Sequence, residues 1–195
     1  SYRAPGPLDM RMNPARGESA MQMIARLGAE ELARLLDENA DEPHAILIAR
    51  LLKEQPLMTT HAAERQVRLG LNRALPALAK ADVKMSIRRT FQALRVAVND
   101  EFCSLDALLQ SVPQCLAPGG RVAMLTFHSG EDRRVKKAFL AGRRAGLYSA
   151  VADTVIRATK EETRANRRAS SAKLRWAVRS PWRSVRRIHA PTAGP

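Results

Sequence analysis

A short polar segment, residues 128–132, follows the most strand-like stretch of the chain and holds side chains suited to acid, base or binding chemistry. Residues 121–128 form a nearly continuous apolar run, as in buried parallel strands. Ligands of open parallel sheets bind beyond the carboxyl ends of strands, so His128 could transfer a proton or contact a ligand. The alternative is structural: His128 bonds its neighbours, and Ser129 with Asp132 forms a helix capping box.

A second set of polar residues lies on one line of a predicted long helix. Apolar residues recur at steps of three and four from Ile87 to Val112, which predicts one continuous helix with a buried face. Since residues advance 100° around a helix, four polar side chains beside that stripe fall within about 60° of one another. They are Arg88, Gln92, Arg95 and Asn99. These side chains could line a substrate cleft, and the alternative is an ordinary solvated face.

The sequence shows no complete catalytic or metal site. It has no glycine-rich nucleotide loop, no paired-cysteine ligand set and no local nucleophile-base motif. Cys103 and Cys115 lie in apolar helical surroundings, so we expect reduced core thiols and a compartment that keeps them reduced. No apolar run is long enough for a membrane span, and we expect no membrane partner.

Proline, glycine and the hydrophobic period divide the chain into the elements that would position these residues. Helical spacing over residues 18–80 predicts a small all-helical module, with Thr59 or Thr60 capping one helix. A turn at residues 118–120 precedes the predicted strand. The runs 151–157 and 172–180 predict two strands that pair antiparallel at the sheet edge.

The formal net charge of +14 predicts a polyanionic partner, with nucleic acid as the leading class. Residues 157–187 hold eleven Lys and Arg against Glu161 and Glu162, so this stretch carries nine of the net positive charges. We expect Arg183, Arg186 and Arg187 to supply RNA affinity without sequence preference, while Arg95 and Asn99 supply discrimination. The alternative is a solvated tail with no fixed partner.

Four spaced motifs resemble the MraW family of ribosomal RNA small-subunit methyltransferases. They are Gly-Pro-Leu-Asp-Met-Arg-Met at residues 6–12, Arg-Thr-Phe-Gln-Ala-Leu-Arg at 89–95 with Asn99, Leu-Ala-Pro-Gly-Gly-Arg at 116–121 leading to Phe-His-Ser at 127–129, and Ser-Ala-Lys-Leu-Arg at 171–175. The motifs occur in family order. Three residues depart from the family pattern, which has Leu at Gly130 and a His-Pro pair at Met85 and Ser86.

The resemblance implies transfer of a methyl group from S-adenosyl-L-methionine to N4 of a cytidine in the decoding region of small-subunit ribosomal RNA. It also implies an α/β fold, a partial Rossmann-like methyltransferase sheet with an inserted all-helical substrate domain. In that family the glycine-rich donor loop and the acidic residue for the donor ribose precede the position matching Ser1. The resemblance therefore assigns no cofactor-binding residue to this chain.

From these features we expect a portion of an RNA methyltransferase, with a catalytically inactive RNA-binding ribosome assembly factor as the alternative. The expected domains are a loop at 1–17, a helical substrate-recognition domain at 18–84, the C-terminal part of the methyltransferase domain at 85–180 and a basic flexible tail at 181–195. The candidate RNA-binding residues are Arg88, Gln92, Arg95, Asn99, His128, Ser129, Arg133, Lys173 and Arg175. Expected partners are the small ribosomal subunit and possible assembly factors, in the cytoplasm of a bacterium or in a mitochondrion or chloroplast.

Overall fold

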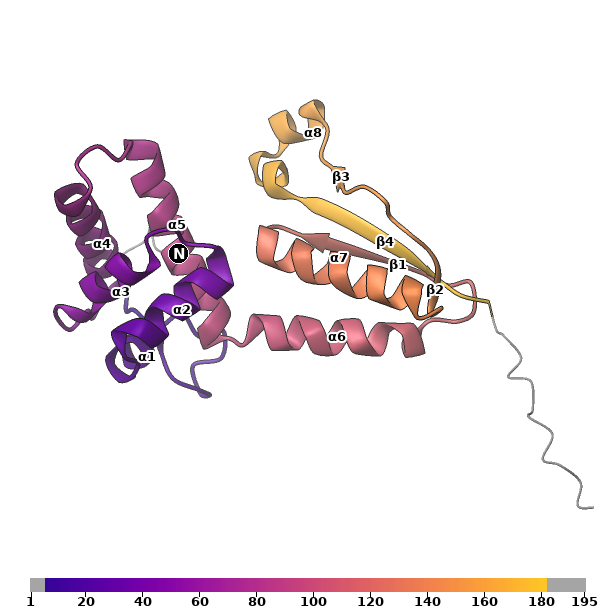
Figure 1. The fold of residues 1–195 in the computed structure, drawn as a ribbon, viewed down its shortest axis with the longest axis horizontal. Helices are drawn as coiled ribbons and strands as arrows, with labels where there is room; N and C mark the ends of the chain where they lie inside the picture. Colours follow the sequence, from indigo (N-terminus) through magenta and orange to yellow (C-terminus); the bar gives the residue numbers. More distant parts are fainter. Residues whose placement is uncertain (1–5, 182–195) are drawn as a thin grey trace, which may run out of the picture. The chain divides into compact units, whose positions relative to one another are not determined.

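The computed structural model of the chain describes residues 6–181, which form an α/β structure with helices and a small antiparallel sheet. The chain divides into two compact units, Ser1–Ser104 and Leu105–Pro195. We describe each unit by itself (Figure 1). The expected functional domains, 18–84 and 85–180, divide the chain at a different place and stay a proposal.

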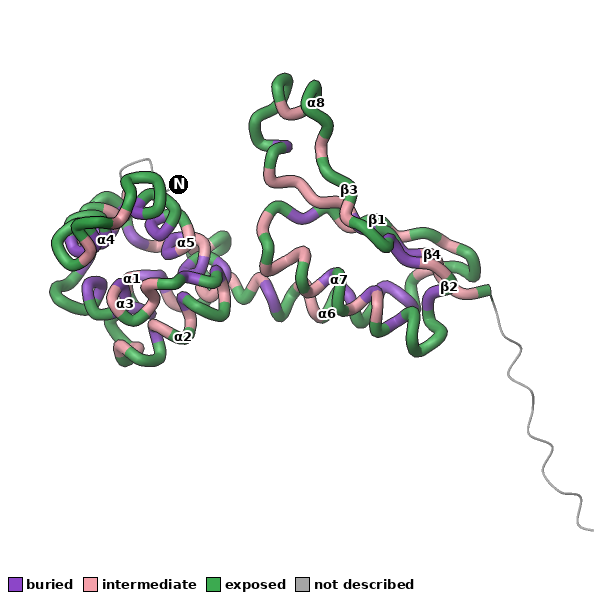
Figure 2. Tube along the Cα trace, turned by 45° about the horizontal axis from the view of Figure 1, so that its top comes forward, coloured by how far each residue is buried: buried purple, intermediate pink, exposed green. Residues whose placement is uncertain are grey.

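The first unit is helical, as the hydrophobic period predicts. Its helices are α1 (Ala20–Arg26), α2 (Ala29–Ala40), α3 (Ala45–Lys53), α4 (Thr60–Ala74) and α5 (Lys80–Val98). Leucine and isoleucine side chains from these helices form one core, and the most deeply buried include Leu32, Leu36, Ile48, Leu52, Leu71 and Leu94. Figure 2 shows buried stretches alternating with exposed ones along these helices.

Local side-chain chemistry sets two of the helix starts and one close helix approach. Ser19 and Gln22 form a capping box at the start of α1, and the Thr59 hydroxyl accepts the Ala62 N–H at the start of α4. Gly70 lies against Leu51 so closely that a Cβ atom there would collide with the leucine side chain. This glycine therefore sets the approach of α4 to α3.

The single long helix expected from Ile87 to Val112 is wrong, because the chain breaks between α5 and α6 (Glu101–Cys115). Asp100 adopts a left-handed backbone conformation with φ of 49°, which ends the helical path. The apolar period continues through this break in the helix, so the sequence pattern does not reveal the break. The cysteines are also not core thiols, because Cys103 and Cys115 are both exposed.

The second unit contains the described sheet. After α6 come β1 (Arg121–Thr126), α7 (Ser129–Arg144), β2 (Tyr148–Val151), β3 (Ile156–Arg157), α8 (Lys160–Ala165), a 3₁₀ helix (Arg167–Ser171) and β4 (Lys173–Arg179). The strand order is β1-β4-β2, with β3 also paired to β4, and every pairing is antiparallel. Gly119, with φ of 75°, makes the expected turn before β1.

Two expectations for the sheet need correction. Residues 151–157 and 172–180 do pair antiparallel, but β4 lies between β1 and β2 instead of at an edge. Within the described residues β1 is not a buried parallel strand, because its pairing with β4 is antiparallel and alternate side chains are exposed. A nearly continuous apolar run therefore does not by itself distinguish a buried strand from a strand with an open face.

Helix α7 covers one face of this sheet (Figure 1). Val135 and Phe139 of α7 pack with Tyr148, Val151 and Ala177. Gly142 permits this contact, since a Cβ atom there would lie 2.6 Å from the Tyr148 ring. Sequence alternation sends Leu125 and Trp176 to the opposite face, where they are 57% and 37% exposed.

The expected basic tail, including Arg183, Arg186 and Arg187, and the first part of the expected loop, residues 1–5, lie outside the described residues. Among the residues that the structure does describe, no helix combines the length and apolarity needed to cross a membrane.

Candidate nucleic-acid interface and strand-end site

The loop at residues 6–17 is tied to the helical unit by backbone hydrogen bonds. The Leu8 N–H donates to Met58 O at 3.0 Å, and the Thr60 N–H donates to Gly6 O at 3.0 Å. The Ala20 N–H donates to Asp9 O at 2.7 Å. This segment has no regular secondary structure, but these bonds fix the backbone of residues 6–9.

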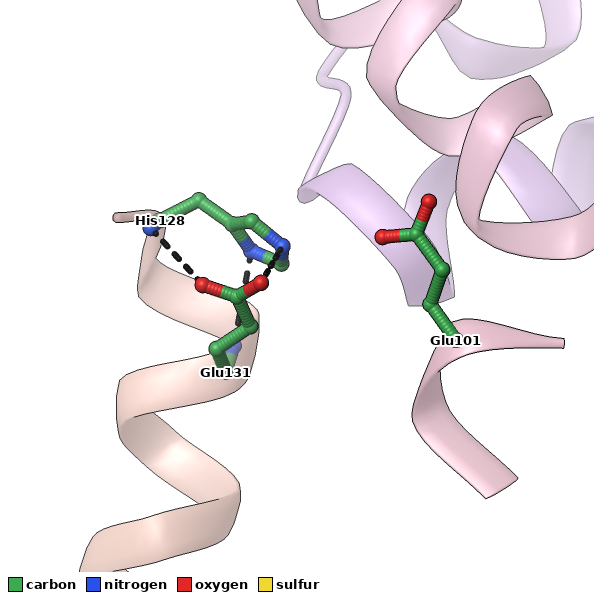
Figure 3. Close-up of side chains that lie close together, drawn as sticks. All are labelled: Glu101, His128 and Glu131. Carbon is green, nitrogen blue, oxygen red and sulfur yellow. Dashed lines mark hydrogen bonds and ion pairs between the residues drawn. The ribbon is translucent and has the colours of Figure 1, made fainter. Parts of the chain in front are cut away.

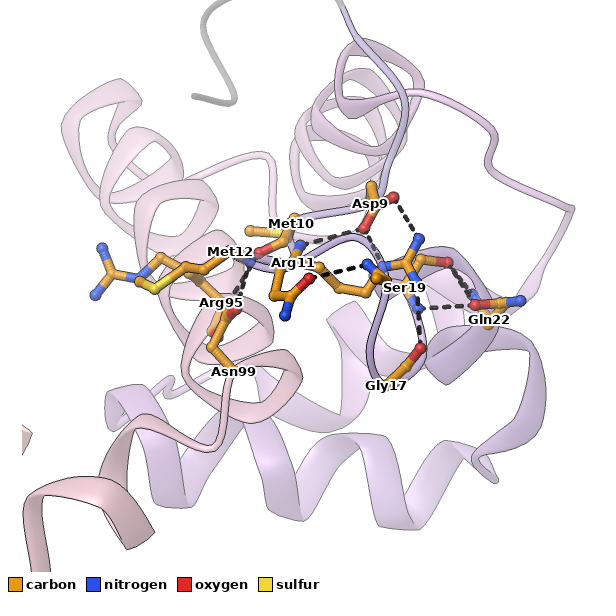
Figure 4. A network of polar contacts seen from close by, with 11 residues as sticks. Asp9, Met10, Arg11, Met12, Gly17, Ser19, Gln22, Arg95 and Asn99 are labelled. Carbon is orange, nitrogen blue, oxygen red and sulfur yellow. Dashed lines mark hydrogen bonds and ion pairs between the residues drawn. The ribbon is translucent and has the colours of Figure 1, made fainter.

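Asp9 and Arg11 close the loop on itself (Figure 4). The Arg11 Nε donates to Asp9 Oδ1 at 2.7 Å and its Nη2 donates to Oδ2 at 2.8 Å, while Nη1 donates to Gly17 O at 3.2 Å. The hydrogen bonds from Arg11 lower the pKa of Asp9 to about 2. At neutral pH the two charges therefore form a local pair that shapes the loop.

Asn99 joins this loop to the end of α5. Its Nδ2 donates to Met10 O and to Arg95 O, each at 2.9 Å, and its Oδ1 accepts the Met12 N–H at 2.7 Å. Met10 has a φ of 67°, an unusual value for a residue other than glycine. Figure 4 shows the amide of Asn99 directed at the loop backbone. The predicted base-reading residue thus has a clear positioning role.

The other residues of the predicted polar line lie on α5. Arg88 and Arg95 are exposed and Gln92 is half-buried. Arg95 donates two hydrogen bonds to Glu101, at 2.7 and 2.9 Å, so its charge is balanced in the structure. Only the Asn99 end of the line contacts the loop, through the hydrogen bonds of Asn99 to Met10 and Met12. An RNA-binding role for these side chains stays a prediction.

The turn between β1 and α7 is built by His128 and Glu131 (Figure 3). His128 is the N-cap of α7: its Nδ1 accepts the Glu131 N–H at 3.4 Å, and its Nε2 lies 3.1 Å from Glu131 Oε1. Glu131 in turn accepts the Phe127 N–H at 2.9 Å. The expected capping box of Ser129 and Asp132 is therefore wrong by one residue, because Ser129 is already the first helical residue.

Glu131 stays ionised although its carboxyl group is partly buried. Burial by itself would raise the pKa of this carboxyl, but the hydrogen bonds from the His128 side chain and the Phe127 N–H lower it to about 2. The ionised carboxylate and the imidazole hold the strand-end turn together. In the described structure this arrangement supports a structural role for His128, and it leaves the predicted RNA contact as a prediction.

Asp132 connects α7 to β4 through the two basic residues of the C-terminal motif. The Arg175 Nε and Nη2 donate to its carboxylate at 2.7 and 3.2 Å, and Lys173 Nζ lies 3.8 Å away. Burial would raise the pKa of Asp132, but Arg175, helped by Lys173 and Arg157, lowers it. Arg175 is only 7% exposed. Among the other candidates of this unit, Ser129 and Arg133 are exposed.

Sequence reasoning did not single out Asp9, Arg11 or Glu131. The short spacing of Asp9 and Arg11 in a loop with several prolines and glycines was a usable signal, since such a pair can close a turn. Glu131 stands three residues after His128, the spacing of a capping box. Histidine is a less common N-cap than serine, so the pattern indicated Ser129 instead.

Comparison with known proteins gives a consistent result. The profile of the MraW methylase family matches residues 1–180. A ribosomal RNA small subunit methyltransferase H 2 of Alkaliphilus metalliredigens (strain QYMF) is 44% identical over 185 residues, which cover 92% of this chain and 53% of that protein. A ribosomal RNA small subunit methyltransferase H of Synechococcus sp. (strain CC9311) is 44% identical over 183 residues, which cover 93% of this chain and 58% of that protein. The chain spans about half the length of the curated relatives it matches.

Proposed function

This chain belongs to the MraW methylase family, and from this premise we propose that it is part of a methyltransferase that modifies small-subunit ribosomal RNA. The observation that carries the proposal is identity of more than 40% to proteins named ribosomal RNA small subunit methyltransferase H, sustained over 92% of the chain. The net charge of +14 supports a polyanionic substrate.

We propose S-adenosyl-L-methionine as the methyl donor and N4 of a cytidine as the acceptor. The described residues do not themselves fit the donor. At the carboxyl end of β1 the Phe127 and His128 N–H groups, which could otherwise face a ligand, are bonded to Glu131. We therefore assign donor binding to the part of the relatives that this chain does not match, and we derive no step through the donor.

We also propose that the described sheet is part of a larger Rossmann-like methyltransferase sheet, interrupted by the helical unit as an inserted substrate domain. Two observations support this. β1 lies at an edge of the described sheet, so one side of its backbone is open to another strand. The face opposite α7 carries exposed Leu125 and Trp176, as expected of a surface that helices cover in a doubly wound sheet.

The role that we propose for this chain is to hold the RNA. Methylation of an exocyclic amine depends mostly on alignment of donor and acceptor, and the target base must be single-stranded or flipped out of its stack. The loop held by Asn99, together with Arg88 and Gln92 on the preceding turns of α5, offers cationic and amide groups on a fixed backbone. We propose bacterial cytoplasm as the site of action, as expected for modification of bacterial ribosomes.

Analysis of ribosomal RNA from the source organism tests this function. Disruption of the gene for this chain should remove N4-methylcytidine from small-subunit RNA, measured by mass spectrometry of nucleoside digests, and a plasmid copy should restore it. Unchanged N4-methylcytidine would overturn the proposal. Unchanged methylation together with defective subunit assembly would instead favour the inactive RNA-binding assembly factor.

A further inference from the structure

A groove runs between α4 and α5, entirely within the helical unit. Its volume is about 590 Å³, and its lining includes Glu64 and Arg68 from α4 and Lys80 and Lys84 from α5. The two helices pack against each other (Figure 1). The apolar part of the lining comes from Val83 and Ile87, each 4% exposed and each part of the helical core. The groove therefore has a fixed apolar floor and polar walls.

The walls carry an excess of positive charge. Glu64 is paired with Arg68 at 3.0 Å, so these two charges balance. Neither Lys80 nor Lys84 makes an ion pair within residues 6–181, and both are exposed. Two cations thus remain available at the groove, one helical turn apart and about 6 Å apart along α5.

The positive charge continues along the same side of α5. Lys80, Lys84 and Arg88 stand at successive four-residue steps, which keeps them within about 80° around the helix. Arg88 in turn leads toward the last turn of α5, where Asn99 holds the loop of residues 6–17. A chain of phosphates that begins in the groove could follow this side of the helix to the loop.

We propose that the α4–α5 groove binds the sugar-phosphate backbone of single-stranded RNA, with Lys80 and Lys84 contacting phosphates; the proposal rests on the function proposed above and deepens it. A positively charged groove with an apolar base suits a strand that presents both phosphates and flat, partly apolar bases and sugars. The Arg68 guanidinium, positioned by Glu64, adds a planar group on which a base can stack. An acidic protein segment would use the lysines but has no comparable need for the apolar floor.

Salt-dependent RNA binding by matched variants of the full chain tests this groove. The double variant Lys80→Gln, Lys84→Gln removes two positive charges from the groove. Its control, Arg34→Gln with Arg50→Gln, removes two from exposed positions on α2 and α3 that do not line it. The probe is a fluorescein-labelled single-stranded RNA of mixed sequence, with affinity measured by anisotropy over a fourfold range of salt. Circular dichroism and thermal unfolding verify that both variants fold.

Each lost contact to a single-stranded phosphate lowers the slope of log affinity against log salt by about 0.7, so the groove variant should lose about 1.4. RNA affinity falls as salt rises in both proteins. Over the fourfold salt range, the factor by which the affinity of the groove variant falls should be about sevenfold smaller than the factor for the unmodified chain. The control variant should keep a steeper slope than the groove variant.

Two results would overturn the groove proposal. The first is a salt slope for RNA binding by the groove variant that equals the slope of the control variant. This result would not affect the proposed methyltransferase function, because the nucleoside digests test that function independently. The second is that the groove variant no longer binds a glutamate-rich peptide, matched in length to the RNA probe, while it binds RNA as well as the control variant does. That pattern would assign the groove to an acidic protein.

Discussion

At the scale of single residues, the basic side chains of this protein divide into those committed to internal partners and those left at the surface. Arg175 belongs to the first class, since its guanidinium is buried against Asp132. Arg143 makes a much more exposed pair with Asp153, whose side chain is 88% exposed. The sequence motif around Arg175 therefore has a structural reason that is separate from any contact with RNA.

Replacement of Asp132 by Ala should lower the free energy of unfolding by about 3 kcal/mol, because it leaves the buried Arg175 charge without its carboxylate. Urea unfolding followed by circular dichroism measures the loss. Since the pKa of Asp132 is lowered in the folded protein, its contribution is present above the ordinary value of 3.8 and declines as the pH falls below it. The difference between the two proteins should therefore shrink in acid.

The matched control is Asp153→Ala, which breaks an exposed pair and should cost less than about 1 kcal/mol. Equal losses for the two variants would contradict the assignment of Asp132 and Arg175 as a buried structural pair.

At the scale of elements, the loop of residues 6–17 and the end of α5 form one positioned surface. Asn99 makes the connection, and the chain leaves α5 immediately afterwards through the left-handed Asp100. The helix break and the loop contact are thus neighbours in sequence and in space. Ending α5 at Val98 places Asn99 as its C-cap, where its amide reaches the backbone of Met10 and Met12.

Replacement of Asn99 by Ala should free the loop without unfolding the helical unit. The amide of Met12 loses its acceptor, and amide hydrogen exchange there should become about fivefold faster, the effect of removing roughly 1 kcal/mol of local stability. Exchange measured by NMR or mass spectrometry at the Leu8 amide, which donates to Met58, serves as the internal control. Unchanged protection at Met12 would show that Asn99 does not hold the loop.

At the scale of the whole molecule, we propose that the chain supplies the RNA-facing elements and part of a larger sheet, and that the unmatched part of its relatives supplies the methyl-donor site. The chain covers only 53% of the Alkaliphilus relative. The open edge of β1 and the exposed apolar face of the sheet are consistent with a sheet that continues in the full-length relatives.

The chain alone should therefore bind S-adenosyl-L-methionine more weakly than low micromolar. Isothermal titration calorimetry measures this directly, with the full-length Alkaliphilus metalliredigens relative titrated in parallel as the comparison. Low-micromolar binding by the chain alone would mean that the donor site lies within residues 1–195 and that our assignment of it to the unmatched half is wrong.

The sequence by itself determined the features that depend on neighbours a few residues away. Helical spacing predicted the helical module, Thr59 or Thr60 was expected to cap one helix, and Pro118 to Gly120 predicted the turn before β1. These features were readable because the hydrogen bonds of caps and turns join residues two to five positions apart. The structure shows that Thr59 is the cap. Spaced motifs identified the family, which the comparisons confirm.

Only the tertiary structure decided the features that depend on which surfaces meet. The bonds of Asn99 reach residues 87 and 89 positions away, and Arg175 reaches Asp132 across 43 positions. The apolar period ran unbroken past Asp100, because a short break can leave the same stripe of side chains buried on either side. The charges of Lys80 and Lys84 were visible in the sequence. Whether they lined a groove or a convex surface depended on how α4 packs against α5, and packing joins residues that no local pattern relates.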